Sequence, residues 1–238
     1  MKSITRFSRI VFVVLSFAVL LLAGCGSDST STPAETFTAS KVSGKTFTYS
    51  SSKGDTGTLA FNADSTWSTT IGTSTFSGTW SVDSNGKLVC VTTAGGNHTI
   101  TYTLTNATTN SLNASAVEVN PSDPNNPSNY TVVFTAIFTT NQVSGKSFTY
   151  SSGGSTGTLA FNADNTWSTT IGTSTFSGTW SVNSNGKLEC KTTAGGDHTN
   201  TYTQLINNST SIINTSVSEV NPADPSNPAN YNATLTKL

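Results

Sequence analysis

A cysteine and a histidine lie close enough in sequence to act together at two places in the chain. Cys90 and His98 in the first half recur as Cys190 and His198 in the second. A histidine beside a cysteine is the beginning of a thiolate nucleophile, provided that an acidic residue orients the histidine. The same residue types bind metals, but a metal site needs three or four ligands. The sequence supplies neither the acid nor the further ligands, so we expect no catalytic residues, no cofactor and no metal site.

The simplest interpretation of these residues is structural. A cysteine on an inner face is most often a small core residue. A histidine just after Gly95-Gly96 is expected at a rim, hydrogen-bonded to backbone. Within the repeats, a disulfide would have to join Cys90 to Cys190, because each copy has a single cysteine. Their inner positions disfavour that bond.

A proline-rich segment is the second candidate for chemistry. Residues 118–130 recur as residues 219–231, with ten of 13 positions identical. Three prolines among Asp and Asn predict a stiff, extended loop between two strands. The alternative is a Ca²⁺ site with Glu118, Asp123 and Asn125 as oxygen ligands. The third of these ligands is serine in the second copy, and the spacing is not that of a known calcium loop.

These residues belong to one domain that is written twice. Thr56–Thr99 and Thr156–Thr199 differ at only five of 44 positions. Two differences are informative, since Val89 and Val91 become glutamate and lysine in the second copy. Alternate residues of a strand share a face, so this face must be exposed. Leu88 and Cys90 must then point inward.

The same alternation of apolar residues with Thr and Ser runs through both copies and is typical of half-buried strands. Nothing after Cys25 shows a helical period. We expect eight strands in the first copy, at residues 45–51, 56–62, 66–72, 75–82, 87–93, 97–105, 111–119 and 129–138.

Short turns between these strands fix which side chains face each other. Three-residue turns at 63–65, 84–86 and 94–96 pair Phe61 with Trp67, Trp80 with Cys90, and Cys90 with Ile100. A two-residue turn at Thr73-Ser74 pairs Ile71 with Phe76 and Trp67 with Trp80. These turns agree on one inner face, which predicts an antiparallel meander with the inward band Phe61, Trp67, Trp80, Cys90 and Ile100.

An eight-stranded meander removes its two exposed edges by closing into a barrel. The strings Gly57–Asp64, Thr66-Trp67, Ser77–Val82 and Asn85–Leu88 resemble the short bacterial lipocalin-like domains, and they recur from Gly157 to Leu188. The resemblance implies an all-β protein of two tandem eight-stranded meander barrels. The alternative is a structural or adhesin-like surface protein of immunoglobulin-like β-sandwich repeats without a ligand. Strand order separates the two, because sequential neighbours make a barrel and a crossing between sheets makes a sandwich.

A barrel of this size has room for packed side chains or for one small ligand. The expected occupant of each barrel is a small apolar molecule, held by inward aromatic and histidine side chains. The candidate ligand-binding residues are Tyr49, Trp67, Trp80, His98 and Tyr102, with Trp167, Trp180, His198 and Tyr202 in the second copy.

The N-terminus indicates where the protein resides. Three basic residues precede the apolar run Val11–Leu22, which is too short to span a bilayer as a helix. The run ends in Leu22–Cys25, which resembles the lipobox of bacterial lipoproteins. The resemblance implies cleavage before Cys25, lipid on its thiol and amine, and a stable membrane anchor. Glycine at position 26 implies delivery to the outer membrane of a two-membrane bacterium. The alternative is an ordinary secretory signal with an incidental cysteine.

Composition excludes one large class of function. Residues 25–238 have eight Lys, no Arg and twelve Asp and Glu, a net charge of −4. A nucleic-acid binder needs a basic face, so we expect no nucleic-acid partner. The sequence does not identify a partner in the cell envelope.

The expected organisation is a signal peptide at 1–24, lipidated Cys25 and a Ser/Thr-rich tether at 25–41, barrel repeat 1 at 42–138, a linker at 139–142, and barrel repeat 2 at 143–238.

Overall fold

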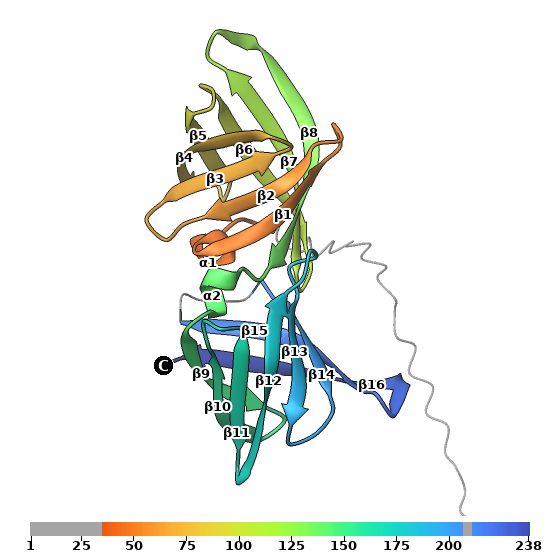
Figure 1. Ribbon diagram of the computed structural model, residues 1–238. Helices are drawn as coiled ribbons and strands as arrows, with labels where there is room; N and C mark the ends of the chain where they lie inside the picture. The colour runs from red at the N-terminus through yellow and green to blue at the C-terminus, as the bar shows by residue number, and fades with distance from the viewer. Residues whose placement is uncertain (1–34, 207–210) are drawn as a thin grey trace, which may run out of the picture. The chain divides into compact units, whose positions relative to one another are not determined.

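The computed structural model describes residues 35–206 and 211–238, which form two closed eight-stranded antiparallel barrels (Figure 1). Every strand pairs with its neighbours in sequence, and the first strand of each barrel also pairs with the last. The meander barrel is therefore confirmed, and the immunoglobulin-like sandwich is wrong, because no strand crosses between two sheets.

The strand bounds differ from the expected ones by a few residues. The first barrel contains β1 (Lys45–Ser51), β2 (Thr56–Phe61), β3 (Thr66–Ile71), β4 (Ser74–Val82), β5 (Leu88–Ala94), β6 (Thr99–Ala107), β7 (Ser111–Asn120) and β8 (Asp123–Ile137). The second contains β9 (Lys146–Ser152), β10 (Ser155–Phe161), β11 (Thr166–Ile171), β12 (Ser174–Val182), β13 (Leu188–Ala194), β14 (Thr199–Gln204), β15 (Ile212–Asn221) and β16 (Asp224–Lys237).

The inner face is the predicted one. Leu88 and Cys90 are buried on β5, whereas Val91 is 39% exposed on the other face. Trp80 pairs with Cys90, and Cys90 pairs with Ile100, as the turn lengths require. The apolar alternation therefore identified the side chains that fill the barrel.

One predicted register is wrong. Ile71 pairs with Ser74 rather than with Phe76, so the two turn residues are Gly72 and Thr73. Gly72 has φ +60°, which glycine adopts without the steric cost of a side chain and which a tight hairpin turn requires. Trp67 consequently pairs with Gly78, two residues from the predicted partner. A shift of two residues keeps every side chain on its face, so the predicted inner face survives this error.

A short helical turn packs at one end of each barrel. In the first barrel α1 (Ala39–Val42) follows Phe37, which is 1% exposed and donates its backbone N–H to Gly86 O. In the second, α2 (Thr140–Val143) follows the buried Phe138, which makes the same bond to Gly186 O. No helix was expected, because one turn is too short to produce a period. The packed part of each repeat thus begins at Phe37 and at Phe138, ahead of the expected bounds at 42 and 143.

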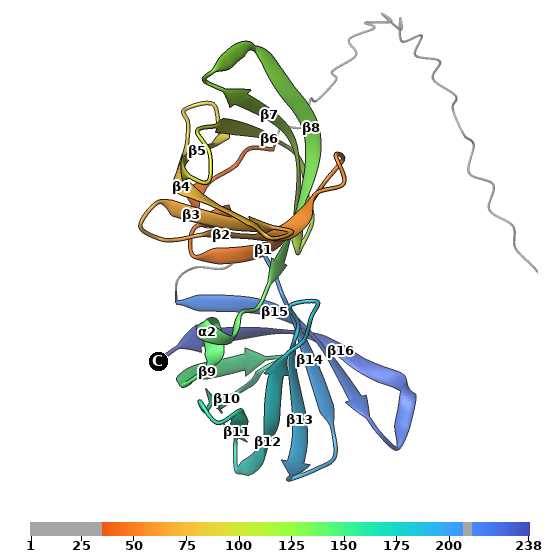
Figure 2. The ribbon, with the colours of Figure 1, turned by 45° about the horizontal axis from the view of Figure 1, so that its top comes forward.

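The proline-rich segment is a hairpin rather than a loop. Asn120 pairs with Asp123, and the long strand β8 starts there, so β7 and β8 extend beyond the rim (Figure 2). Asn120 Oδ1 accepts the backbone N–H of Ser122 and closes the turn. The two prolines of β8 at 124 and 127 lie where the register shifts, because proline has no N–H for a regular ladder.

Among the residues that the structure describes, no helix is long and apolar enough to cross a membrane.

Candidate functional site

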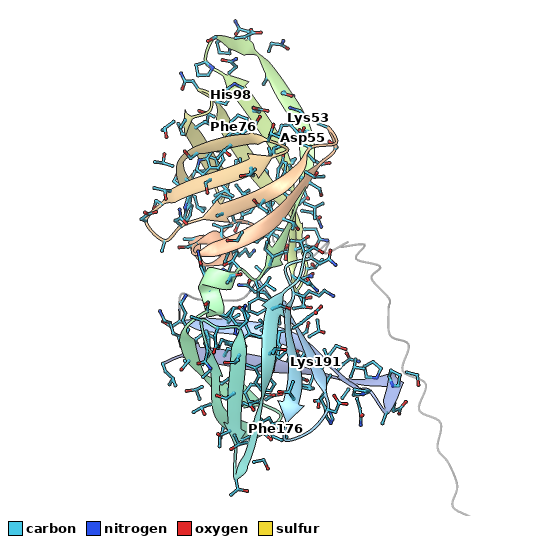
Figure 3. All side chains as sticks on the ribbon, in the orientation of Figure 1. Lys53, Asp55, Phe76, His98, Phe176 and Lys191 are labelled. Carbon is cyan, nitrogen blue, oxygen red and sulfur yellow. The ribbon has the colours of Figure 1, made fainter. Side chains whose placement is uncertain are left out.

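The first barrel contains a cavity of about 440 Å³ at the end away from α1. Side chains at this end come from the strand termini and from the turns that join them, and Lys53, Asp55, Phe76 and His98 all lie there (Figure 3). The cavity is lined by Tyr49, Asp55, Leu59, Trp67, Thr69, Ile71, Ser74, Phe76, Thr92, Gly96, His98, Ile100, Tyr102, Glu118 and Tyr130.

Four of the five residues expected to hold a ligand in the first barrel line this cavity. They are Tyr49, Trp67, His98 and Tyr102. Trp80 does not line it, because its indole N–H donates to Asn62 O at 3.0 Å and its ring packs edge-on against Phe61. Trp80 therefore belongs to the packed half of the interior.

The second barrel repeats this division. Trp167, His198 and Tyr202 line a cavity of about 560 Å³. Trp180 again lies outside the lining, with its indole N–H bonded to Asn162 O at 3.1 Å. Both copies thus place one tryptophan in the cavity wall and one in the core.

Glu118 organises the mouth of the first cavity. One carboxylate oxygen lies 2.6 Å from His98 Nδ1, and the other lies 3.2 Å from Lys53 Nζ. The same ammonium sits over the ring of Tyr130, 4.0 Å from its centre. Burial alone would raise the pKa of the Glu118 carboxyl, but the hydrogen bonds from His98 and Lys53 outweigh it and hold the pKa below its ordinary value. Glu118 is therefore ionised at neutral pH.

Two expectations are corrected by this arrangement. His98 pairs with a carboxylate rather than with backbone, because the β7 strand brings Glu118 beside it. The proposed Ca²⁺ ligands do not converge either, since Glu118 faces His98 and Lys53 while Asp123 and Asn125 are exposed on the hairpin. Among residues 35–206 and 211–238, no three His, Cys, Asp or Glu side chains gather closely enough to hold a metal ion.

The tyrosines add hydroxyl groups to the cavity wall. Burial raises the pKa of Tyr102 well above its ordinary value, and it likewise raises those of Tyr49 and Tyr130. These phenols stay neutral and act as hydrogen-bonding groups in a wall of aromatic, aliphatic and polar side chains. The cavity can accept an apolar body with a polar group directed toward the His98–Glu118 pair.

The cysteines lie in the core rather than in a reactive position. Cys90 and Cys190 are free thiols that are at most 1% exposed. Burial raises the pKa of each thiol far above its ordinary value, so both remain protonated. The geometry pairs His98 with Glu118 and gives the thiol no role in the cavity chemistry.

The second cavity keeps the acid and histidine but changes their surroundings. His198 Nδ1 lies 2.7 Å from Glu219 Oε1, and the Tyr231 hydroxyl donates to Glu219 Oε2 at 3.3 Å. The cavity is lined by Tyr150, Ser152, Gly153, Ser155, Leu159, Trp167, Thr169, Ile171, Phe176, Thr192, His198, Asn200, Tyr202, Glu219 and Tyr231.

Glu118 and Tyr130, with their counterparts Glu219 and Tyr231, are cavity residues that the sequence interpretation does not assign to the ligand site. It places them at the ends of a proline-rich loop and considers Glu118 only as a Ca²⁺ ligand. The sequence does contain a signal for these residues. They are the first and last residues of a segment that both copies retain, although the strands before that segment have diverged.

No protein-family model matches this sequence, and a comparison with curated proteins finds no similar sequence. The function therefore has to be argued from the geometry of the two cavities.

Proposed function

We propose that this protein is a lipid-anchored lipoprotein of the bacterial cell envelope, in which each lipocalin-like barrel binds one small, mainly apolar molecule. The protein acts by binding, without catalysis and without a cofactor. The ligand inserts its apolar body among the aromatic side chains and directs a polar group to the histidine–glutamate pair at the mouth.

One observation carries the proposal of ligand binding. Both barrels combine a packed end with an aromatic-lined cavity, of about 440 and 560 Å³, and place a histidine–glutamate pair at its mouth. Binding sites for small molecules have volumes of roughly 300–1,000 Å³, and aromatic side chains together with oriented polar groups line them. A barrel that needed only stability would gain from filling these spaces.

The lipid anchor is a separate part of the proposal. It rests on the lipobox-like sequence, because Cys25 lies outside the described residues. Cys25→Ser is expected to abolish lipid attachment and release the protein from outer-membrane fractions, which immunoblotting of fractionated cells would measure. Retention of the unlipidated variant in those fractions would contradict the anchor.

Native mass spectrometry of residues 26–238, purified from cells without detergent, tests ligand binding. This chain keeps both closed barrels and every residue that the structure describes. We expect a discrete mass above that of the polypeptide, lost on extraction with organic solvent. The identity of the extracted compound then gives the class of ligand.

A matched pair of variants shows whether the extra mass resides in the cavity. Thr92 is 4% exposed and lines the first cavity, whereas the adjacent Val91 is 39% exposed on the outer face. Thr92→Phe fills the cavity and should remove the ligand, and Val91→Phe should retain it. Thr192→Phe and Lys191→Phe make the same comparison in the second barrel. A polypeptide that carries no ligand would instead favour a surface interaction protein.

A further inference from the structure

The two barrels differ at the place where Lys53 sits in the first one. Its ammonium lies 3.2 Å from Glu118 Oε2 and 4.0 Å from the centre of the Tyr130 ring. A carboxylate next to an aromatic face is a strong site for an organic cation. In the first barrel the chain's own lysine occupies that site.

The second barrel keeps the carboxylate and the tyrosine but has no lysine to occupy the site. Ser52-Lys53-Gly54-Asp55 is replaced by the shorter Gly153-Gly154-Ser155. The second cavity extends to this turn, since Ser152, Gly153 and Ser155 are part of its wall. Among the described residues that line this cavity, none is lysine or arginine.

The groups around Glu219 are polar or titratable but carry no permanent positive charge. His198 Nδ1 lies 2.7 Å from one carboxylate oxygen, and the Tyr231 hydroxyl donates to the other at 3.3 Å. None of the ion pairs among the described residues joins Glu219 to a lysine or an arginine. The second cavity therefore has a negative group at its mouth that an external cation can pair with.

A further substitution adds a hydrogen-bond acceptor to the same cavity. Asn200 stands where the first barrel has Ile100, and both residues line their cavities. Asn200 Oδ1 is buried and has no hydrogen-bond partner. An unpaired buried acceptor is costly, so the cavity gains when a ligand supplies an N–H to it.

We propose that the second barrel binds an organic ammonium compound, an amine on an aromatic or aliphatic body, with its charged nitrogen at Glu219 and Tyr231. An N–H of the ligand donates to Asn200 Oδ1, and the body lies against Trp167, Phe176 and the other aromatic side chains of the wall. In the first barrel Lys53 holds the equivalent position beside Glu118 and Tyr130, so an external ammonium group would have to displace it. This assignment rests on the proposed function and names the ligand class of one of its two sites.

Isothermal titration calorimetry with two probes of nearly equal shape tests the assignment. The probes are 2-phenylethylammonium and the neutral 2-phenylethanol, added to residues 26–238. Both probes can donate a hydrogen bond to the Glu219 carboxylate, but only the ammonium compound adds the attraction between opposite charges. We therefore expect one equivalent of the ammonium compound to bind at least tenfold more tightly than the alcohol, a difference of about 1.4 kcal/mol.

Two variants and a matched control locate the site. Glu219→Gln removes the charge with little change of shape and should reduce ammonium affinity to that of the alcohol. Glu118→Gln makes the same change in the first barrel and should leave the ammonium site unaltered. Lys53→Ala removes the lysine ammonium from Glu118 and Tyr130 in the first barrel, and it should add a second equivalent of bound ammonium compound. Circular dichroism verifies that each variant is folded.

The results separate this assignment from the broader proposal. Equal affinity for ammonium and alcohol would overturn the ammonium site while leaving apolar ligand binding intact. Unchanged stoichiometry in folded Lys53→Ala together with unchanged affinity in folded Glu219→Gln would also overturn it. Absence of binding by both probes overturns the ammonium site too, whereas ligand binding itself is decided by the mass measurement.

Discussion

Trp80→Ala is the perturbation that most directly tests the division of each barrel into a packed end and a cavity. Trp80 is buried, with 7% of its surface exposed, and it does not line the cavity. Its ring lies edge-on to Phe61, with 5.9 Å between ring centres, and its indole N–H donates to Asn62 O at 3.0 Å. The substitution removes an aromatic contact, a hydrogen bond and most of a buried side chain at once.

The expected loss of stability follows from these contacts. A buried tryptophan removes roughly 200 Å² from water, worth about 5 kcal/mol at about 25 cal/mol per Å². The hydrogen bond adds about 1 kcal/mol. Partial collapse of the surrounding side chains and the methyl group that alanine retains reduce the total. We therefore expect the first barrel to lose about 3–5 kcal/mol of unfolding free energy.

Urea denaturation of residues 26–238, followed by far-ultraviolet circular dichroism, measures this loss. Each sheet closes on itself, so the variant should move the transition of one barrel and leave that of the other near its original midpoint. With a slope of about 1–3 kcal/mol per molar urea, the midpoint falls by about 1 M or more. Val89→Lys is the control, because the same position is glutamate in the second copy, and it should change stability by less than about 0.5 kcal/mol. The assignment of the inner face is refuted if Val89→Lys is as damaging as Trp80→Ala.

Three further predictions concern charge, backbone and thiols. The pKa of Glu118 is lowered from its ordinary value of 4.5, so the ionised carboxylate stabilises the folded barrel fully at pH values above 4.5. This stabilisation is lost as the pH falls through the lowered pKa. Glu118→Gln should therefore make the urea midpoint of the first barrel fall less between pH 7 and pH 3, and an unchanged fall would contradict the ion pairing. Gly78→Ala should lower the melting temperature far more than Gly72→Ala. A Cβ at Gly78 would lie 1.8 Å from a backbone oxygen of β5, whereas a Cβ at Gly72 would have nothing within 4 Å. Alanine at position 72 is strained only by the left-handed backbone conformation, at a cost of about 1–2 kcal/mol. Burial and a raised pKa should keep the thiols of Cys90 and Cys190 unreactive toward iodoacetamide in the folded protein, whereas both should react after unfolding in urea. Mass spectrometry counts the labelled thiols. Rapid labelling of the native protein would show that these cysteines are not in the core.

The sequence by itself determined the fold class and the inner face. Strand alternation has a period of two, so each apolar residue identifies its face without knowledge of its partner. Val89 and Val91 tolerate charge in the second copy, which placed Leu88 and Cys90 inside before any pairing was known. Turn lengths then made sequential neighbours the simplest pairing, and closure followed from the need to remove two edges.

Only the tertiary structure decided which inner residues line the cavity and which groups meet at its mouth. A two-residue shift between β3 and β4 leaves every face unchanged, so alternation could not distinguish Gly78 from Trp80 as the partner of Trp67. Closure of the barrel brings Lys53, His98 and Glu118 together from three parts of the chain that are far apart in sequence. The helical turn after Phe37 is too short to show a period, and it is held by tertiary packing and one bond to Gly86. Local pattern thus fixes which way a side chain points, whereas its neighbours depend on register and closure, which involve residues distant along the chain.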